Sequence, residues 1–267
     1  VELESAGWYV EQQPSRGDEQ LAPPGVDLRF RGMGLTATLE RERGALGLVL
    51  RGGGSAGVVS TMALDDATRL AMLAEARLRL TFGIGRLTMN ALASGQVQHG
   101  RTSGDSWRRS ISAGTLTLGA GGRYLRADVA HGSGPGTRTD PAVRAFESFV
   151  LGGSGAPYMD GAWLSQRVPL PAVPTGFLVG RQFGWYRVAL GGGVLPGLSL
   201  EPYFQWVAAG DSLTSWKRIA GLEQHLAIPS LGFARLPALR VRWGVGYSLD
   251  EPFRYRLRGY AAVRYTP

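Results

Sequence analysis

Apolar and polar residues alternate along most of the chain from about residue 26 onward. Near the C-terminus every second residue between Leu239 and Leu249 is apolar, and arginine, glycine or serine stands between them. After a short turn at 250–252, residues 253–265 repeat this pattern with aromatic and aliphatic residues on one side. Successive side chains of a β-strand point to opposite faces. The pattern therefore predicts a hairpin with one apolar face and one arginine-bearing face.

Residues 67–84 show the same two-residue repeat, and a helix is the alternative interpretation there. Asp65 or Asp66 could cap a helix rich in alanine and leucine. The apolar residues nevertheless keep the two-residue step from Leu70 to Ile84. A helix would scatter those positions around its circumference, so we favour a strand.

The whole pattern predicts twelve strands, at 27–39, 44–52, 67–84, 86–100, 107–119, 122–131, 144–152, 176–190, 197–208, 216–227, 238–249 and 253–265. Ten or fourteen strands are the alternatives. Most segments approach the roughly 9–11 residues that cross a bilayer and exceed the roughly 5–6 of soluble strands. Aromatic residues stand near predicted strand ends, as in interfacial girdles (Trp107, Phe149, Phe177, Trp206, Tyr247, Phe253, Tyr265). We therefore expect an all-β, antiparallel transmembrane β-barrel. A soluble sandwich, propeller or lipocalin-like barrel is the rival architecture.

The first residues of the chain differ from the rest. Residues 1–25 are polar and are interrupted by Pro14, Pro23 and Pro24, so we expect an N-terminal arm or linker before a barrel at 26–267. The chain begins at Val1, which suggests a processed chain or a fragment.

Composition excludes several classes of site. The chain has no cysteine, so a disulfide framework and a thiolate metal site are both excluded. Its three histidines, His99, His131 and His225, are far apart in sequence, and we expect no metal and no cofactor. The glycine runs 52–54 and 191–193 lack the lysine or helix of a phosphate loop.

The net charge of +8 comes almost entirely from arginine, because Lys217 is the only lysine. Basic charge suits nucleic acid, an anionic membrane surface or an anion-lined cavity. The arginines fall on the polar side of the predicted strands. A guanidinium near the bilayer midplane costs about 2–4 kcal/mol, so we expect these side chains to face the lumen. The predicted lumen-lining set is Arg69, Arg77, Arg79, Arg86, Arg240, Arg242, Arg254, Arg256, Arg258 and Arg264.

These arginines allow two arrangements. They could line an anion-favouring channel, or they could pair with Glu75, Glu201, Glu223 and other acids in a closed interior.

His131 and Ser133 are separated by one glycine. This spacing resembles the catalytic histidine and serine of the outer-membrane phospholipase A family, a twelve-stranded barrel in which the serine attacks a lipid ester. The resemblance is limited to these two positions, because the sole asparagine, Asn90, lies in another predicted strand. The strand count places the pair on the periplasmic side. The glycine-rich stretch 132–136 is also typical of a flexible loop.

Residues 149–153 read Phe-Val-Leu-Gly-Gly and precede a long loop and five predicted strands. Over about 45 residues this resembles the barrel of the surface-antigen family of assembly and translocation factors. In that family the loop carries an arginine-glycine-aromatic motif that folds into the lumen. Here the loop at 154–174 has Asp160-Gly161-Ala162-Trp163 and Gln166-Arg167 instead. The resemblance implies a related barrel, without the motif that accompanies assembly activity.

The sequence therefore predicts a bacterial outer-membrane barrel that is not an enzyme. We expect either a passive channel for small anionic solutes or the membrane anchor of a larger assembly. The alternatives are a surface-antigen-type factor and an outer-membrane lipid hydrolase. The expected partners are the lipid bilayer, lipopolysaccharide and other outer-membrane or periplasmic proteins, and no nucleic acid.

Overall fold

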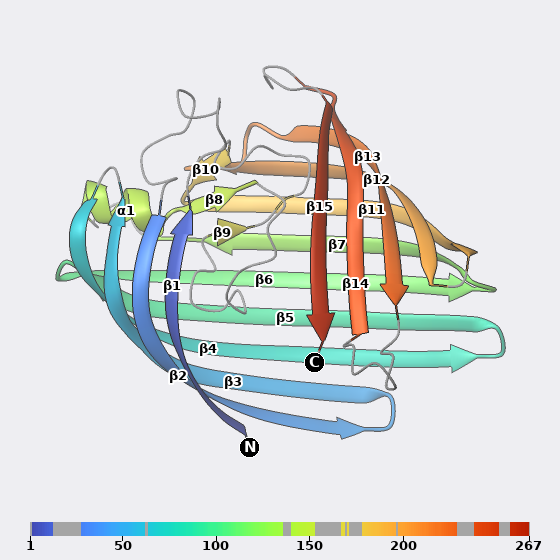
Figure 1. Ribbon diagram of the computed structural model, residues 1–267, viewed down its shortest axis with the longest axis horizontal. Coiled ribbons are helices and arrows are strands. Elements are labelled where there is room, and N and C mark those ends of the chain that lie inside the picture. The colour runs from blue at the N-terminus through green and yellow to red at the C-terminus, as the bar shows by residue number, and fades with distance from the viewer. Residues whose placement is uncertain are drawn as a thin grey trace.

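The computed structural model describes residues 2–12, 28–61, 64–135, 140–152, 167–168, 170, 178–195, 197–228, 238–250 and 257–266. One curved sheet of twelve strands contains most of them (Figure 1). Every neighbouring pair in this sheet is antiparallel. In spatial order its strands are β1 (Glu2–Gln12), β2 (Leu28–Arg43), β3 (Leu46–Thr61), β4 (Leu64–Ile84), β5 (Leu87–Thr102), β6 (Asp105–Ala120), β7 (Arg123–Ser133), β11 (Gln182–Leu195), β12 (Leu198–Gly210), β13 (Lys217–Ile228), β14 (Ala238–Ser248) and β15 (Leu257–Thr266).

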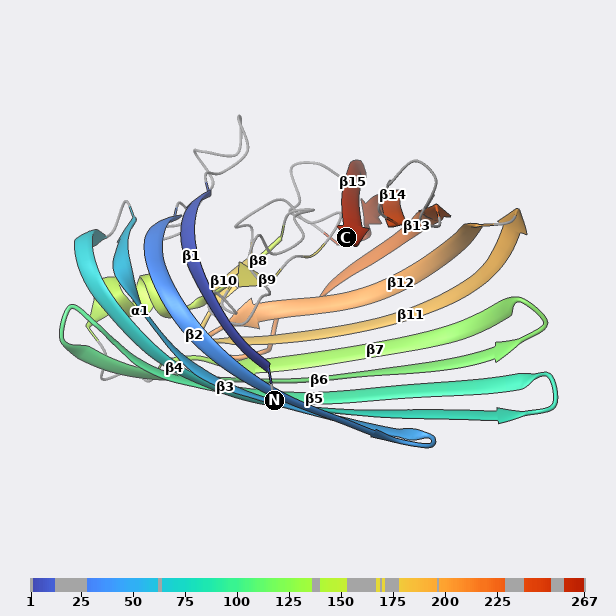
Figure 2. The same cartoon turned by 60° about the horizontal axis from the view of Figure 1, so that its bottom comes forward.

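A smaller unit interrupts this order between β7 and β11. It contains the helix α1 (Pro141–Glu147) and three short strands, β8 (Phe149–Leu151), β9 (Arg167–Val168) and β10 (Leu178–Gly180). The three strands form their own sheet in the order β10, β8, β9. We call α1 and β8–β10 the inward segment, because Figure 2 shows them on the concave side of the main sheet.

Side chains are sorted between the two faces of the main sheet. On β4, Leu70 and Met72 are 50% and 69% exposed, whereas Arg69 is 1% exposed. We call the face of Leu70 the outer face and the face of Arg69, which contacts the inward segment, the inner face. Large exposed apolar side chains continue around the outer face, including Met33, Leu35, Leu48, Leu116, Leu125, Val129, Val188, Leu190 and Val245. The two-residue period of the sequence therefore separates two different environments, as predicted.

The twelve-strand sheet agrees with the predicted strand number, but two of its members differ. The polar residues 2–12, expected in an arm or linker, form β1 and pair along their full length with β2. The strand expected at 144–152 is the end of α1 followed by β8, and β8 lies outside the main sheet. The strand favoured at 67–84 is confirmed and the helix alternative is wrong, because these residues belong to β4, which pairs with β3 and β5.

The connections between strands differ at the two ends of the sheet. Tight turns join β2 to β3, β4 to β5 and β6 to β7, and each contains glycine with positive φ, such as Gly85 at 59° and Gly121 at 57°. The other end has a tight turn between β5 and β6, at Ser103 and Gly104, and it also carries the connection from β1 to β2 and the inward segment. The strand order leaves β1 and β15 as the two edges, and no described ladder joins them. Among the described residues, no helix combines the length and the apolar character needed to cross a bilayer.

Candidate functional site

The inward segment leaves and re-enters the main sheet at one place. β7 pairs directly with β11, with Ser133 opposite Gln182 in the register. Just beyond this pair, the Gly134 amide donates a hydrogen bond of 2.6 Å to the Arg181 carbonyl. Because β7 and β11 stay paired at this point, the inward segment can turn over the inner face without interrupting the hydrogen bonds between neighbouring strands of the main sheet.

Local sequence explains why α1 begins at Pro141. Asp140 is the N-cap residue, because its side chain accepts from the Val143 amide at 3.4 Å and its carbonyl accepts from the Arg144 amide at 2.8 Å. Proline fits the first helical position, since the amide that it lacks would have no partner in the helix. The helical spacing then brings Val143, Phe146 and Glu147 to one buried face.

Glu147 ties α1 to the wall of the main sheet. Its side chain is fully buried and accepts from Arg69 Nε at 2.9 Å and from Arg109 Nη1 at 3.1 Å. Thr102 Oγ1 donates a third bond of 3.0 Å, and Arg109 also donates to the Glu147 carbonyl at 3.1 Å. Because a buried charge is costly without partners, one carboxylate between two guanidiniums fixes the end of α1 on β4 and β6.

Trp107 holds both guanidiniums in place. The Cζ atoms of Arg69 and Arg109 each lie 4.8 Å from the Trp107 ring. The indole Nε1 donates to Thr102 Oγ1 at 3.0 Å. A buried apolar cluster surrounds this group and includes Phe30, Val59, Ala67, Ala71, Leu73, Val143 and Phe146. The glutamate anchor is therefore embedded in a dry environment.

The short strands of the inward segment extend this dry layer. Phe149 on β8 contacts Phe183 on β11 edge to face, with ring centroids 4.7 Å apart. Leu151, Leu170 and Leu178 belong to the same buried cluster, together with inner-face residues of five wall strands (Ala130, Phe183, Ala189, Tyr203, Val207, Ile219, Tyr260). The inward segment thus covers part of the concave face.

A second polar network lies on the inner face of β11–β15 and β7. Arg187 Nη2 donates to Glu201 Oε1 at 2.5 Å and to Glu223 Oε2 at 2.6 Å. The other oxygen of each carboxylate accepts from a tyrosine, Glu201 from Tyr124 at 2.7 Å and Glu223 from Tyr260 at 2.6 Å. Each carboxylate therefore has a partner on both oxygens, which suits its almost complete burial.

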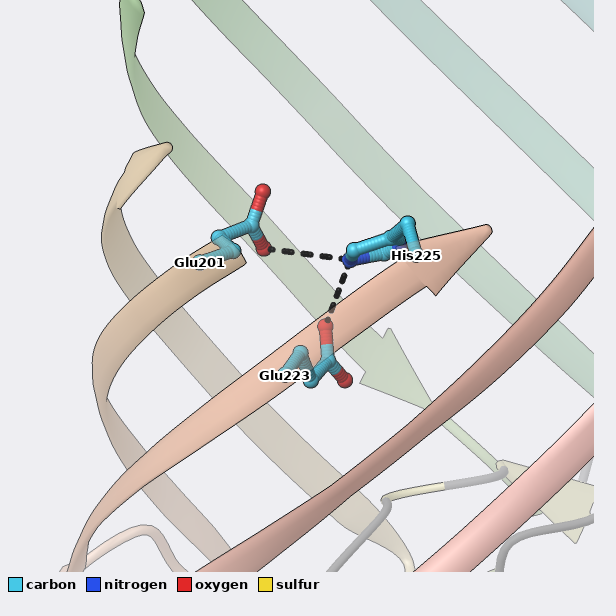
Figure 3. A group of neighbouring side chains, drawn as sticks. All are labelled: Glu201, Glu223 and His225. Atoms are coloured by element: carbon cyan, nitrogen blue, oxygen red, sulfur yellow. Dashed lines mark ion pairs between the residues drawn. The ribbon is translucent and has the colours of Figure 1, made fainter. Parts of the chain in front are cut away.

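His225 completes the group that Figure 3 shows with the two glutamates. Its Nε2 lies 3.3 Å from Glu223 Oε2 and 4.0 Å from Glu201 Oε1. These three side chains have the types and the proximity of a metal site, with ligand atoms within 4.8 Å. The same two carboxylate oxygens already accept from Arg187, so a cation between them would face a guanidinium. The geometry therefore fits an ion-pair network better than a metal site.

The arginines that sequence assigned to the lumen have different surroundings. Arg69 pairs with Glu147, Arg77 with Glu75 and Arg79 with Glu42. Arg242 Nε lies 3.8 Å from Glu223, and Arg258 is half-buried on β15.

The side chains of four of the remaining positions lie outside the described part of the structure. Arg254 and Arg256 fall beyond the described residues. Arg240 and Arg264 stand opposite each other in the β14–β15 register, and only their backbone is described. Arg86 differs from the expectation, because it lies exposed in the turn between β4 and β5 and not on a strand face.

The key residues that sequence reasoning missed are Arg109, Glu147 and Arg187. Arg187 joins glutamates that lie 14 and 36 residues away, so strand register was needed to find it. Glu147 had a local signal, since the Asp140-Pro141 cap and the 143, 146, 147 spacing are typical of a helix.

His131 and Ser133 lie on the outer face of β7, where both are exposed. The expected periplasmic position rested on a strand count without β1. With β1 included, the pair lies at the end of the sheet that carries the inward segment, opposite the tight turns. No described hydrogen bond joins the two side chains.

The Phe-Val-Leu of the surface-antigen resemblance forms β8, which lies inside the concave face instead of in the wall. Five wall strands, β11–β15, do follow it. Residues 154–166 and 171–174 of the loop that was compared with the family's motif lie outside the described residues.

Comparisons with known proteins place the fold. No family model matches the chain, and no curated protein matches it. Among solved structures, CdiB from Acinetobacter baumannii is similar with a TM-score of 0.53 and 11% identity, over 99% of this chain and 48% of CdiB. Acinetobacter baumannii OccAB1 has a TM-score of 0.47 and 13% identity over 89% of this chain and 67% of OccAB1. Pseudomonas aeruginosa OccK11 (OpdR) has a TM-score of 0.41 and 14% identity, over 98% of this chain and 74% of OccK11.

The chain thus spans about half the length of CdiB, and this likeness concerns the fold alone. Together with the twelve-stranded antiparallel sheet, it confirms the predicted fold class: the chain has the fold of an outer-membrane-type antiparallel β-barrel.

Proposed function

We propose that the chain is a barrel of the bacterial outer membrane, with lipid around the outer face of the main sheet. The observation that carries this proposal is the sorting of side chains, with large apolar residues exposed outside and Arg69, Arg109, Arg187, Glu201 and Glu223 buried inside. A soluble protein rarely exposes so wide an apolar surface to water. The strands, from 10 residues in β15 to 21 in β4, are long enough to cross a bilayer.

The two ends of the sheet favour one orientation. Outer-membrane barrels have short periplasmic turns and longer extracellular connections. The tight turns after β2, β4 and β6 therefore belong on the periplasmic side, and the inward segment enters from the cell exterior. We call the latter end the outer end.

Within this barrel we propose a passive pore that the inward segment narrows. Support comes from the Glu147 anchor, which holds α1 against the inner face through Arg69 and Arg109. The apolar contacts of β8 and β10 continue the cover across β7 and β11–β13. A segment anchored at a buried charge can obstruct a lumen yet still be released by one change at the anchor.

Many of the inner-face arginines pair with acidic side chains. This pairing favours the alternative in which arginines and acids neutralise each other in the interior over a strongly anion-selective channel. Arg51 and Arg77 approach Glu75, Arg126 pairs with Asp128, and Arg187 pairs with two glutamates. A compensated wall carries little excess positive potential. We therefore propose only a weak preference for anions.

The Glu147→Gln variant tests the narrowed pore. Glutamine would remove the carboxylate charge that pairs with two buried guanidiniums, and loss of one partner of a buried ion pair destabilises the folded state by roughly 3–5 kcal/mol. We expect larger and more frequent single-channel openings than in the wild type, in planar bilayers. Recordings across a salt gradient should give a small reversal potential, with the sign that indicates a preference for anions over cations.

Glu42→Gln is the matched control, because Glu42 also pairs with an arginine, Arg79, but both side chains are more than half exposed near the tight-turn end. Its openings should equal those of the wild type. If Glu147→Gln and Glu42→Gln both match the wild type, the inward segment does not limit the pore.

A lipid hydrolase is the second candidate, since His131 and Ser133 face outward at the outer end, where lipid would reach them. The missing hydrogen bond between them leaves the serine without its base in this arrangement. We expect no release of fatty acid from phospholipid micelles by the wild type, and no difference in Ser133→Ala. Hydrolysis by the wild type that Ser133→Ala abolishes would support the enzyme and exclude the passive role.

A further inference from the structure

An apolar groove runs along the outer face at the N-terminal part of the sheet. Its cavity of about 950 Å³ lies over β3, between the side chains of β2 and β4. Met33 and Leu35 on β2 form one wall, and Leu70 and Met72 on β4 form the other, with Gly54 and Ala56 of β3 as the floor. The groove therefore exists because small residues stand between two rows of large ones.

Packing within the chain requires neither Gly54 of this floor nor Gly52, the next outward residue of β3. A Cβ atom at Gly52 or Gly54 would meet its nearest neighbour at 3.7 or 3.8 Å, which is ordinary contact. By contrast, a Cβ at Gly53 or Gly57, which face inward, would lie 2.2 or 2.5 Å from a backbone oxygen. The inward glycines allow close backbone approach, whereas the outward glycines leave space on the surface facing lipid.

Basic side chains flank the groove on β5 and β6. His99 and Arg101 line its edge, next to Met72 and Leu70 in the register. Arg108 stands directly opposite His99, within reach of both side chains. Arg101 donates a long hydrogen bond of 3.4 Å to Ser106, and no described ion pair involves these three residues.

These groups lie toward the outer end of otherwise apolar strands. A guanidinium facing lipid is costly unless it reaches the headgroup layer, where an anionic group can pair with it. Arginine matches a phosphate with two parallel hydrogen bonds. An apolar groove beside a basic cluster is complementary to a molecule with an acyl chain and a phosphate.

We infer that this surface binds a lipid of the surrounding outer leaflet whose phosphate headgroup carries a net negative charge. The phosphate lies at Arg101, Arg108 and His99, and one acyl chain lies over Ala56 and Gly54 and continues along β3 toward Gly52. The outward residues of β3 from Ala56 to Gly52 span about 13 Å, from the strand rise per residue, which accommodates a large part of an acyl chain. The inference rests on the proposed membrane location and orientation.

Native mass spectrometry of the detergent-solubilised protein tests this site with dimyristoyl phosphatidic acid as the probe. We expect retention of phosphatidic acid to be at least tenfold stronger than that of dimyristoyl phosphatidylcholine. Arg101→Ser with Arg108→Ser should remove this preference, since each arginine near an anionic headgroup strengthens binding severalfold. Arg123→Ser is the control. It changes an exposed arginine at the tight-turn end of β7, far along the strands from Arg101 and Arg108, and it should leave the preference intact.

A second variant separates the groove from the basic cluster. Gly54→Leu places a side chain on the floor, and its Cβ would lie 3.8 Å from the nearest atom, the Ala71 carbonyl oxygen. We expect this variant to weaken phosphatidic acid retention, while inorganic phosphate competes with the lipid as effectively as in the wild type. Equal retention of both lipids, or a loss in Arg123→Ser as large as in the double variant, would overturn the site. A chain that stays soluble and monodisperse without detergent would instead overturn the membrane location on which the site depends.

Discussion

Replacing Arg187 by methionine will destabilise the folded barrel by roughly 3–5 kcal/mol, the usual cost of removing one partner from a buried ion pair. The substitution keeps an unbranched apolar stem but leaves Glu201 and Glu223 facing each other without the cation between them. It also removes the guanidinium that lies 4.4 Å from the Tyr203 ring. Urea unfolding of the refolded protein in micelles, followed by tryptophan fluorescence, measures the change.

Two variants make this expectation specific. Arg79→Met removes a pair with Glu42 in which both side chains are more than half exposed, so its effect should stay within about 1 kcal/mol. Adding Glu201→Gln and Glu223→Gln to Arg187→Met should recover most of the stability, because the uncompensated charges are gone. An Arg187→Met protein as stable as Arg79→Met would show that the network does not hold the wall together.

The second large effect concerns the outer face. Leu50→Arg should lower stability in vesicles by about 2–4 kcal/mol, as a cation on the lipid side of a barrel does near the midplane. Leu50 is 42% exposed and stands between Leu39 and Ala76 in the register, both on the outer face. Urea titration in phosphatidylcholine vesicles, with folded protein followed by gel mobility, gives the difference.

Its neighbour Val49 supplies the control, because the adjacent residue of a strand points to the opposite face. Val49→Arg would place the cation between Glu40 and Arg77 on the inner face, and it should be tolerated better than Leu50→Arg. An equal or larger loss in Val49→Arg would mean that the outer face does not contact lipid.

The sequence predicted the wall of the barrel well because one physical rule dominates there. A strand with lipid on one side and polar contacts on the other must alternate, so β4, β5 and β14 could be recognised from Leu70, Leu87 or Val245 and their neighbours. β1 was missed because its alternation is broken: Trp8 and Val10 have the same parity as Glu2 and Glu4, and its place depends on pairing with β2. Whether such a segment forms a strand depends on the neighbouring strand that pairs with it as much as on its own residues.

The candidate sites were harder to predict, since they join residues that are distant in sequence. Tyr124 and Glu201 are 77 residues apart, and Arg69 and Glu147 are 78 residues apart. Alternation assigns such residues to the inner face but cannot say which of them meet. The helix α1 is a different case, because the Asp140-Pro141 cap is local and was overlooked in favour of the alternation around Phe149.

The edges of the main sheet have a geometric consequence. With twelve strands in antiparallel order, β1 and β15 run in opposite directions, as the arrows in Figure 1 show. Hydrocarbon offers no partner for the free amides and carbonyls of an edge strand, and each costs several kcal/mol there. Rolling the sheet into a cylinder would bring these two strands together at a seam with the same antiparallel geometry as every other ladder, so neither would need to be inverted.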